Sequence, residues 1–139
     1  MRFMILVKAT KEADEAAAMP TEAKMAEMAA YHEDLAKAGV LLEAQGLKPT
    51  ARGWRVSYDG PQRVIVDGPF TEAKEIVAGY TIIQTKTREE AMEWTRRFPN
   101  PTPGDSAFEI EVRELFEMED FADSQEHERF TALRRELEG

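Results

Sequence analysis

Residues 2–8 of the chain read RFMILVK. All five positions between the two basic residues are apolar, and because the side chains of a strand alternate between its two faces, both faces of this segment are apolar. This pattern is typical of a strand in the middle of a sheet that is covered on both sides. The segment therefore predicts a central strand that runs through the hydrophobic core.

A helical pattern follows over residues 22–38. Thr21 supplies a capping hydroxyl at its start, and Gly39 occupies the position where a left-handed residue often ends a helix. The spacing of its apolar residues predicts one inward-facing stripe, with the two methionines as core filler: Met25, Met28, Ala29, His32, Leu35 and Ala36.

The rest of the main domain alternates between strand and helix patterns. Strands are predicted at residues 40–47, 54–58, 63–66, 79–85 and 108–113, and Thr87 opens a second helix that Pro99 ends. The order strand, helix, strand, inserted hairpin, strand, helix, strand is the split βαβ arrangement of ferredoxin-like α+β domains. Helices then cover one face of the sheet only, so we expect a second copy of the chain to cover the other.

The chain divides by composition into a main domain, residues 1–115, and an acidic helical extension, residues 116–139. The extension holds eight acidic and three basic residues. Phe130, Leu133 and Leu137 form a thin apolar seam on its predicted helix, and we expect this seam to lie across the partner subunit.

Composition limits the classes of function. The chain has no cysteine, which excludes disulfides and thiolate chemistry and fits the cytoplasm. Its net charge of −9 disfavours nucleic acid as a direct partner. No segment is apolar over enough residues to enter a membrane, and neither metal-ligand clusters nor cofactor-binding motifs are present, so no metal and no cofactor are expected.

His32 and Asp67 are the candidate catalytic residues. His32 is an ionisable ring on an apolar stripe, and Asp67 precedes Gly68-Pro69 in a turn at the end of a strand. If the fold brings them together, the carboxylate orients the ring, and the ring acts as an acid or base. The alternative is that His32 is a hydrogen-bonded core residue and that Asp67 only forms the turn.

Three cations near the hairpin are candidate anchors for a substrate carboxylate: Lys74, Arg52 and Arg55. Arg63 is a further candidate on the hairpin itself. The alternative is that these side chains only solvate the hairpin.

The stretch from Asp67 to Glu75, DGPFTEAKE, together with Gly79-Tyr80 and the segment around His32, resembles the YciI-related proteins and, within them, the branch named after its Asp-Gly-Pro-Phe (DGPF) motif. The resemblance covers about residues 1–115. It implies a dimeric α+β barrel with a pocket lined by His32 and Asp67. The family pattern differs around Glu43, and the tail lies outside it.

Two hypotheses follow. In the first, the protein is a cofactor-independent lyase, isomerase or hydrolase-like enzyme that acts on a small anionic or aromatic molecule. In the second, it is a non-catalytic dimeric module that binds a ligand or regulates transcription, because family members also occur beside or fused to sigma factors.

Overall fold

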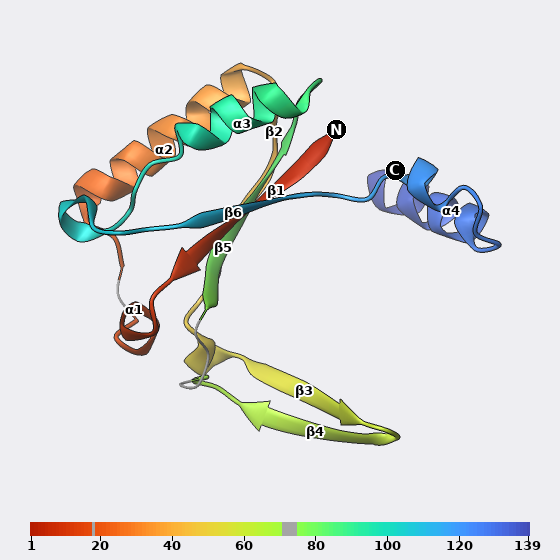
Figure 1. Cartoon of the computed structure of the whole chain (residues 1–139), viewed down its shortest axis with the longest axis horizontal. Helices are drawn as coiled ribbons and strands as arrows, with labels where there is room; N and C mark the ends of the chain where they lie inside the picture. Colours follow the sequence, from red (N-terminus) through yellow and green to blue (C-terminus); the bar gives the residue numbers. More distant parts are fainter. Residues whose placement is uncertain (18, 71–74) are drawn as a thin grey trace.

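The computed structural model describes residues 1–17, 19–70 and 75–139. Its central antiparallel sheet has the strand order β2-β5-β1-β6, formed by β1 (Arg2–Ala9), β2 (Leu41–Gly46), β5 (Ile76–Gln84) and β6 (Ile110–Glu114). Helices α2 (Glu22–Lys37) and α3 (Arg88–Arg96) lie on the same side of this sheet (Figure 1). The prediction of a ferredoxin-like α+β fold with an inserted hairpin and a C-terminal helix is thereby confirmed.

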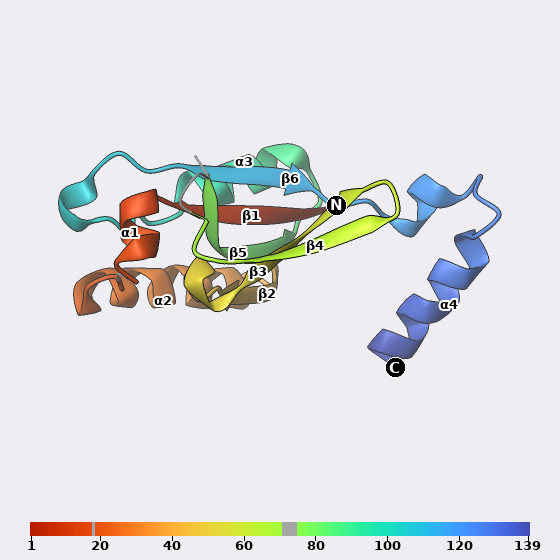
Figure 2. The ribbon, with the colours of Figure 1, turned by 90° about the horizontal axis from the view of Figure 1, so that it is seen from below.

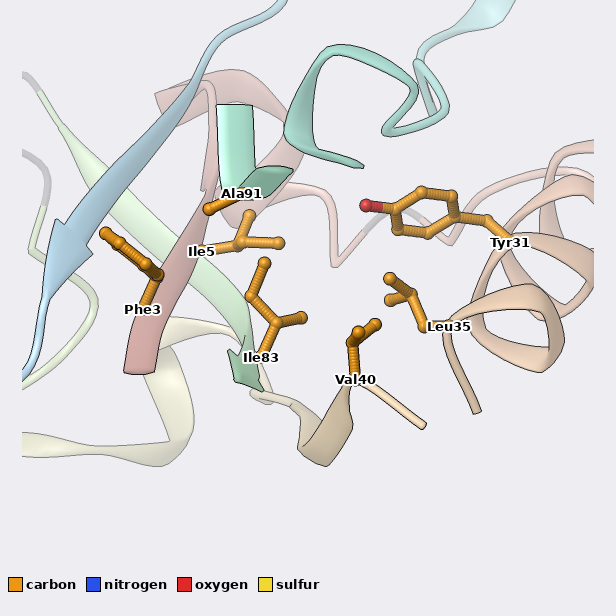
Figure 3. Close-up of a cluster of buried hydrophobic side chains, with 7 residues drawn as sticks. All are labelled: Phe3, Ile5, Tyr31, Leu35, Val40, Ile83 and Ala91. Atoms are coloured by element: carbon orange, nitrogen blue, oxygen red, sulfur yellow. The ribbon is translucent and has the colours of Figure 1, made fainter. Parts of the chain in front are cut away.

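The core lies between the sheet and the two helices. Phe3 and Ile5 of the central strand point to this side, and Figure 3 shows them beside Ile83 of β5 and Ala91 of α3. Leu35, Tyr31 and Val40 complete the cluster. Burial of each large apolar side chain contributes about 1.5–3 kcal/mol, so this cluster is a main source of the stability of the domain.

The buried face of α2 differs from the predicted stripe. Tyr31 and Leu35 are its buried residues, whereas Met25 is exposed and Met28 is half-buried. The interpretation of the two methionines as core filler was therefore wrong. The rings of Trp94 and Phe98 pack against Tyr31, so Tyr31 rather than the methionines belongs to the core.

The predicted hairpin forms a separate two-stranded sheet, β3 (Trp54–Asp59) and β4 (Gln62–Asp67). Gly60 in its turn has φ +58°, a conformation that glycine adopts readily. Figure 1 shows the hairpin projecting on the side of the sheet away from α2 and α3. The short helix η1 (Thr50–Arg52) leads into it.

A short helix, α1 (Lys11–Glu15), lies between β1 and α2, in a segment for which the sequence patterns predicted no helix or strand. The hydroxyl of Thr10 caps it by accepting a hydrogen bond from the N–H of Ala13. Five residues are too few for a clear helical period, which explains why the pattern did not predict it.

The C-terminal segment extends beyond the sheet. After η2 (Pro103–Asp105) and β6, it contains η3 (Met118–Phe121) and α4 (His127–Glu138). Figure 2 shows α4 standing to one side of the main domain. Within the described ranges, no helix combines the length and apolar character that a crossing of a lipid bilayer requires.

Candidate active site beside His32

His32 lies on the inner side of α2, where both of its ring nitrogens have partners. Nδ1 is 2.8 Å from the carbonyl oxygen of Met28, one turn earlier, and Nε2 is 2.8 Å from Oγ1 of Thr81. A carbonyl oxygen only accepts, so Nδ1 carries the proton. In the neutral ring, Nε2 is then the acceptor, and the hydroxyl of Thr81 donates to it.

Thr81 reaches the ring because of the alternation of β5. Gly79, Thr81 and Ile83 are the residues of this strand that face the helices, and Thr81 is 2% exposed. The sequence reasoning missed Thr81 as a site residue. The available signal was a threonine in an apolar strand on the face opposite a helix that carries a histidine.

Two aromatic rings pack against the imidazole of His32. Tyr31 and Phe98 both meet it edge to face, with ring centroids 5.4 and 6.2 Å from that of His32. The hydroxyl of Tyr31 donates to the carbonyl of Trp94 at 2.7 Å. Burial raises the pKa of Tyr31 to about 12, so this hydroxyl stays protonated at neutral pH.

A hollow of about 270 Å³ opens beside His32 on the surface of α2. Its walls are mostly apolar: Pro20, Lys24, Met25, Met28, Ala29, His32 and Pro101. His32 is the only residue with an imidazole ring among those that line this hollow, so a molecule in the hollow meets one side chain of the kind that serves as a general acid or base.

Lys24 is the cationic residue in this wall, and its ammonium group already pairs with two carboxylates. Its ammonium pairs with Asp105 and lies 3.7 Å from Glu27. The hydrogen bond to Asp105 is the main reason that the pKa of Lys24 is raised. With two carboxylates against one ammonium, this rim is not positive, which disfavours a carboxylate ligand next to it.

The structure does not bring Asp67 to His32 within one chain. Asp67 is exposed at the end of β4, opposite Trp54 of β3, and the partners of the His32 ring are Met28 and Thr81 instead. The base of the hairpin, where Asp67 lies, projects away from the helices.

The motif around Asp67 instead packs against Thr50. The N–H of Gly68 donates to the carbonyl of Gly53 at 2.9 Å, and the N–H of Phe70 donates to Oγ1 of Thr50 at 3.2 Å. A β-carbon on Gly68 would lie 1.8 Å from the carbonyl oxygen of Thr50. Only glycine fits this close approach of two backbone segments.

Buried Asp14 of α1 holds Thr50 in turn. Its carboxylate accepts from the backbone N–H of Thr50 at 2.8 Å and from its hydroxyl at 2.5 Å. This chain of hydrogen bonds ties α1, η1 and the Gly68-Pro69-Phe70 turn together, so the motif has a structural role as well as any chemical one.

Two of the predicted substrate anchors, Arg52 and Arg55, lie away from the hollow. Arg52 ends η1, and Arg55 lies on β3 with its guanidinium 3.9 Å from the ring centroid of Phe70. Neither lines the hollow beside His32. Lys74 falls outside the described residues.

The fold and the site together define a ferredoxin-like α+β domain with a histidine in the wall of an apolar hollow. The model of the YCII-related domain matches residues 1–119, and the chain therefore belongs to this family. The match is to the family as a whole, and membership of the DGPF-motif branch stays a prediction.

Two similar proteins extend the comparison. The uncharacterized protein R00369 of Rhizobium meliloti (strain 1021) is 26% identical over 95 residues, which are 68% of this chain and 77% of that protein. Among solved structures, the 5-chloro-2-hydroxyhydroquinone dehydrochlorinase of Burkholderia phenoliruptrix AC1100, in complex with 2,5-dihydroxybenzoquinone, aligns with a TM-score of 0.46 and 13% identity. The alignment covers 84% of this chain and 94% of the dehydrochlorinase.

Proposed function

We propose that the protein binds a small aromatic or other largely apolar organic molecule in the hollow beside His32 and that His32 transfers a proton to or from it. The reaction would be of the lyase, isomerase or hydrolase-like kind and would need no cofactor. The observation that carries this proposal is the tautomer of His32. The carbonyl of Met28 holds the proton on Nδ1, which leaves a lone pair on Nε2.

The chemistry of the wall narrows the expected ligand. Of the two classes considered from the sequence, anionic and aromatic, the paired state of Lys24 favours the aromatic one. Met25 and Met28 supply flexible, polarizable contacts that suit a flat ring. An acidic hydroxyl or C–H of the ligand is then the proton donor to Nε2.

Thr81 takes a positioning role in this proposal. In the resting protein its hydroxyl occupies the lone pair of Nε2. A substrate proton reaches Nε2 when the substrate replaces this hydrogen bond, and the Thr81 hydroxyl then turns to accept from the protonated ring, because a hydroxyl both donates and accepts.

The predicted pairing of His32 with Asp67 is retained only as a proposal for two copies of the chain in contact. Asp67 is exposed on a hairpin that projects from the domain, so its carboxylate is available to a partner subunit. The anchoring roles of Arg52, Arg55 and Lys74 likewise remain predictions. Arg52 and Arg55 lie beside or on the hairpin rather than at the hollow.

We also propose that the protein is a homodimer. Among the described residues, α2 and α3 cover one side of the sheet, and apolar hairpin residues stay exposed, among them Trp54 at 64% and Ile65 at 68%. Large apolar side chains that are exposed together on one surface of a monomer commonly mark a protein–protein interface.

One observation favours the second hypothesis, a non-catalytic ligand-binding or regulatory module linked to transcription. Both ring nitrogens of His32 already have partners in the protein, and Thr81 is almost completely buried. A ring whose two nitrogens are both hydrogen-bonded within the protein has a structural role, and no catalytic role is needed to explain its position. In this case the hollow binds a ligand, and His32 only holds α2 on β5.

A screen of small phenols, aromatic acids and lactones distinguishes the two hypotheses. Turnover is followed by absorbance, and binding by NMR of the methyl groups of Met25 and Met28 in the wall of the hollow. The variant is His32→Gln, and the matched control is His127→Gln, which changes the histidine at the start of α4.

If the enzyme proposal is correct, the wild type and His127→Gln convert at least one of the compounds. The folded His32→Gln variant does not convert that compound. Turnover that survives His32→Gln would refute it. Compounds that shift the Met25 and Met28 methyl signals without ever being converted would support the ligand-binding module instead.

A further inference from the structure

Two apolar surfaces of the chain remain uncovered by any described residue of the same chain. The first is one face of the hairpin. Val56 pairs with Ile65 across the two strands, and directly opposed residues share a face, on which Trp54 and Tyr58 also lie because they alternate with Val56. We call these four residues the hairpin face, and each of them is exposed.

The second surface is the seam of α4, formed by Phe130, Leu133 and Leu137. The three side chains recur at helical spacing and are 52%, 52% and 82% exposed. A hollow of about 440 Å³ runs beside the seam, with Glu126 and Arg129 on its rim.

Both surfaces belong to segments, the hairpin and α4, that extend from the domain. Figure 1 shows the hairpin on the side of the sheet away from α2 and α3 and α4 beyond the end of β6, and the two do not touch each other there. Their lengths match: α4 has 12 residues and spans roughly 18 Å, and each hairpin strand has 6 residues and spans roughly 20 Å.

The charges around the two surfaces are opposite. Residues 48–67, which contain the hairpin face, hold four basic residues and two acidic residues. Residues 117–138, which contain η3 and the seam of α4, hold eight acidic residues and three basic ones. Opposite charge around two apolar surfaces favours their association and sets its orientation.

We infer that the seam of α4 in one copy of the chain binds the hairpin face of a second copy. In a two-fold symmetric dimer this contact occurs twice, so the hairpin and α4 of each subunit both contact the partner. We call this pair of contacts the clasp. The inference rests on the homodimer proposed above and adds to it the pair of surfaces that meet.

The absence of cysteine from the chain allows a direct test by cross-linking. Full-length Ile65→Cys and Leu133→Cys proteins are mixed, left to exchange subunits and treated with a short bis-maleimide. We expect a cross-linked product of twice the chain mass of 15.8 kDa from the mixture and little from either protein alone. Met92→Cys in place of Leu133→Cys is the matched control, because Met92 is similarly exposed on α3, and it should give little product.

Sedimentation of the wild-type protein separates this inference from the homodimer itself. A dimeric mass without the mixed cross-link would overturn the clasp and leave the homodimer standing, whereas a monomeric mass would overturn both. An intrachain cross-link in dilute Ile65→Cys/Leu133→Cys double variant would show that the tail folds onto its own hairpin, which also overturns the clasp.

A substitution tests the same contact without a reagent. Leu133→Glu places a charge in the seam and should raise the dissociation constant of the dimer by about tenfold or more. Met92→Glu, on the other side of the domain, should leave it within about twofold. Equal dissociation constants for wild type and Leu133→Glu would overturn the clasp.

Discussion

The Nε2 atom of His32 lies 2.8 Å from Oγ1 of Thr81, and this hydrogen bond joins the middle of α2 to β5 across 49 positions of the sequence. His32 also lines the apolar hollow, whereas Thr81 is 2% exposed. The bond therefore links the stability of the domain to the orientation of the imidazole in the wall of the hollow.

Thr81→Val should destabilise the protein by about 1–2 kcal/mol, because it keeps the volume of the side chain but leaves Nε2 of His32 without its partner. Chemical denaturation measures the change. Thr95→Val is the control: the hydroxyl of Thr95 bonds to the carbonyl of Met92 within its own helix at an exposed position, so we expect less than about 0.5 kcal/mol. Equal losses in the two variants would argue against a special role of Thr81.

The tautomer of His32 is a second prediction. Because the carbonyl of Met28 accepts from Nδ1, a long-range proton–nitrogen NMR spectrum of the neutral ring should show the proton on Nδ1 and an unprotonated Nε2. The signal of His127 is assigned by its loss in His127→Gln. A proton found on Nε2 would contradict the proposed base.

Gly68→Ala should cost about 3 kcal/mol or more, because the new β-carbon would meet the carbonyl of Thr50, a backbone group that cannot turn away. Gly46→Ala is the control, since no atom lies within 4 Å of its added β-carbon. Melting curves of both variants provide the measurement. Similar stabilities would mean that the backbone of the motif does not approach Thr50 as described.

The stability of the protein should fall between about pH 10 and 12 in a manner that depends on Tyr31. Its pKa is raised from 10.0 to about 12 by burial, so the folded state holds the proton more tightly than the unfolded state. The contribution is complete below pH 10 and is lost as the pH rises toward 12.

Tyr31→Phe isolates this effect. At pH 7 the variant should be less stable than the wild type by about 1 kcal/mol, because the hydrogen bond to the carbonyl of Trp94 is gone. Above pH 10 the wild type loses stability that the variant does not lose, so the difference should shrink or change sign. A difference that stays constant up to pH 12 would exclude the linkage.

Phe121→Ala should loosen α4. The ring of Phe121 lies between those of Phe116 and Phe130, with centroids 5.1 and 6.3 Å away, and it connects η3 to α4. Without it, backbone amides of α4 should exchange with solvent roughly tenfold faster, while those of β1 should not change. Unchanged exchange in α4 would show that other contacts hold the helix.

Much of the fold could be predicted from local patterns. The unbroken apolar run of β1 placed it in the middle of the sheet, and Thr21, Gly39 and Thr87 marked helix ends through groups that act on their immediate neighbours. The hairpin followed from its Gly60-Pro61 turn. The short helix α1 was missed because it is shorter than the pattern needed to detect it.

The candidate site depended on contacts that no local pattern contains. The sequence by itself determined that His32 shares a helix face with Leu35, since residues three positions apart lie on one side of a helix. Only the tertiary structure decided that Thr81 rather than Asp67 meets the ring within the chain, because the register of β5 and the packing of Gly68 on Thr50 set where each side chain lies. These are relationships between segments far apart in the chain, and they follow from the packing of the whole domain.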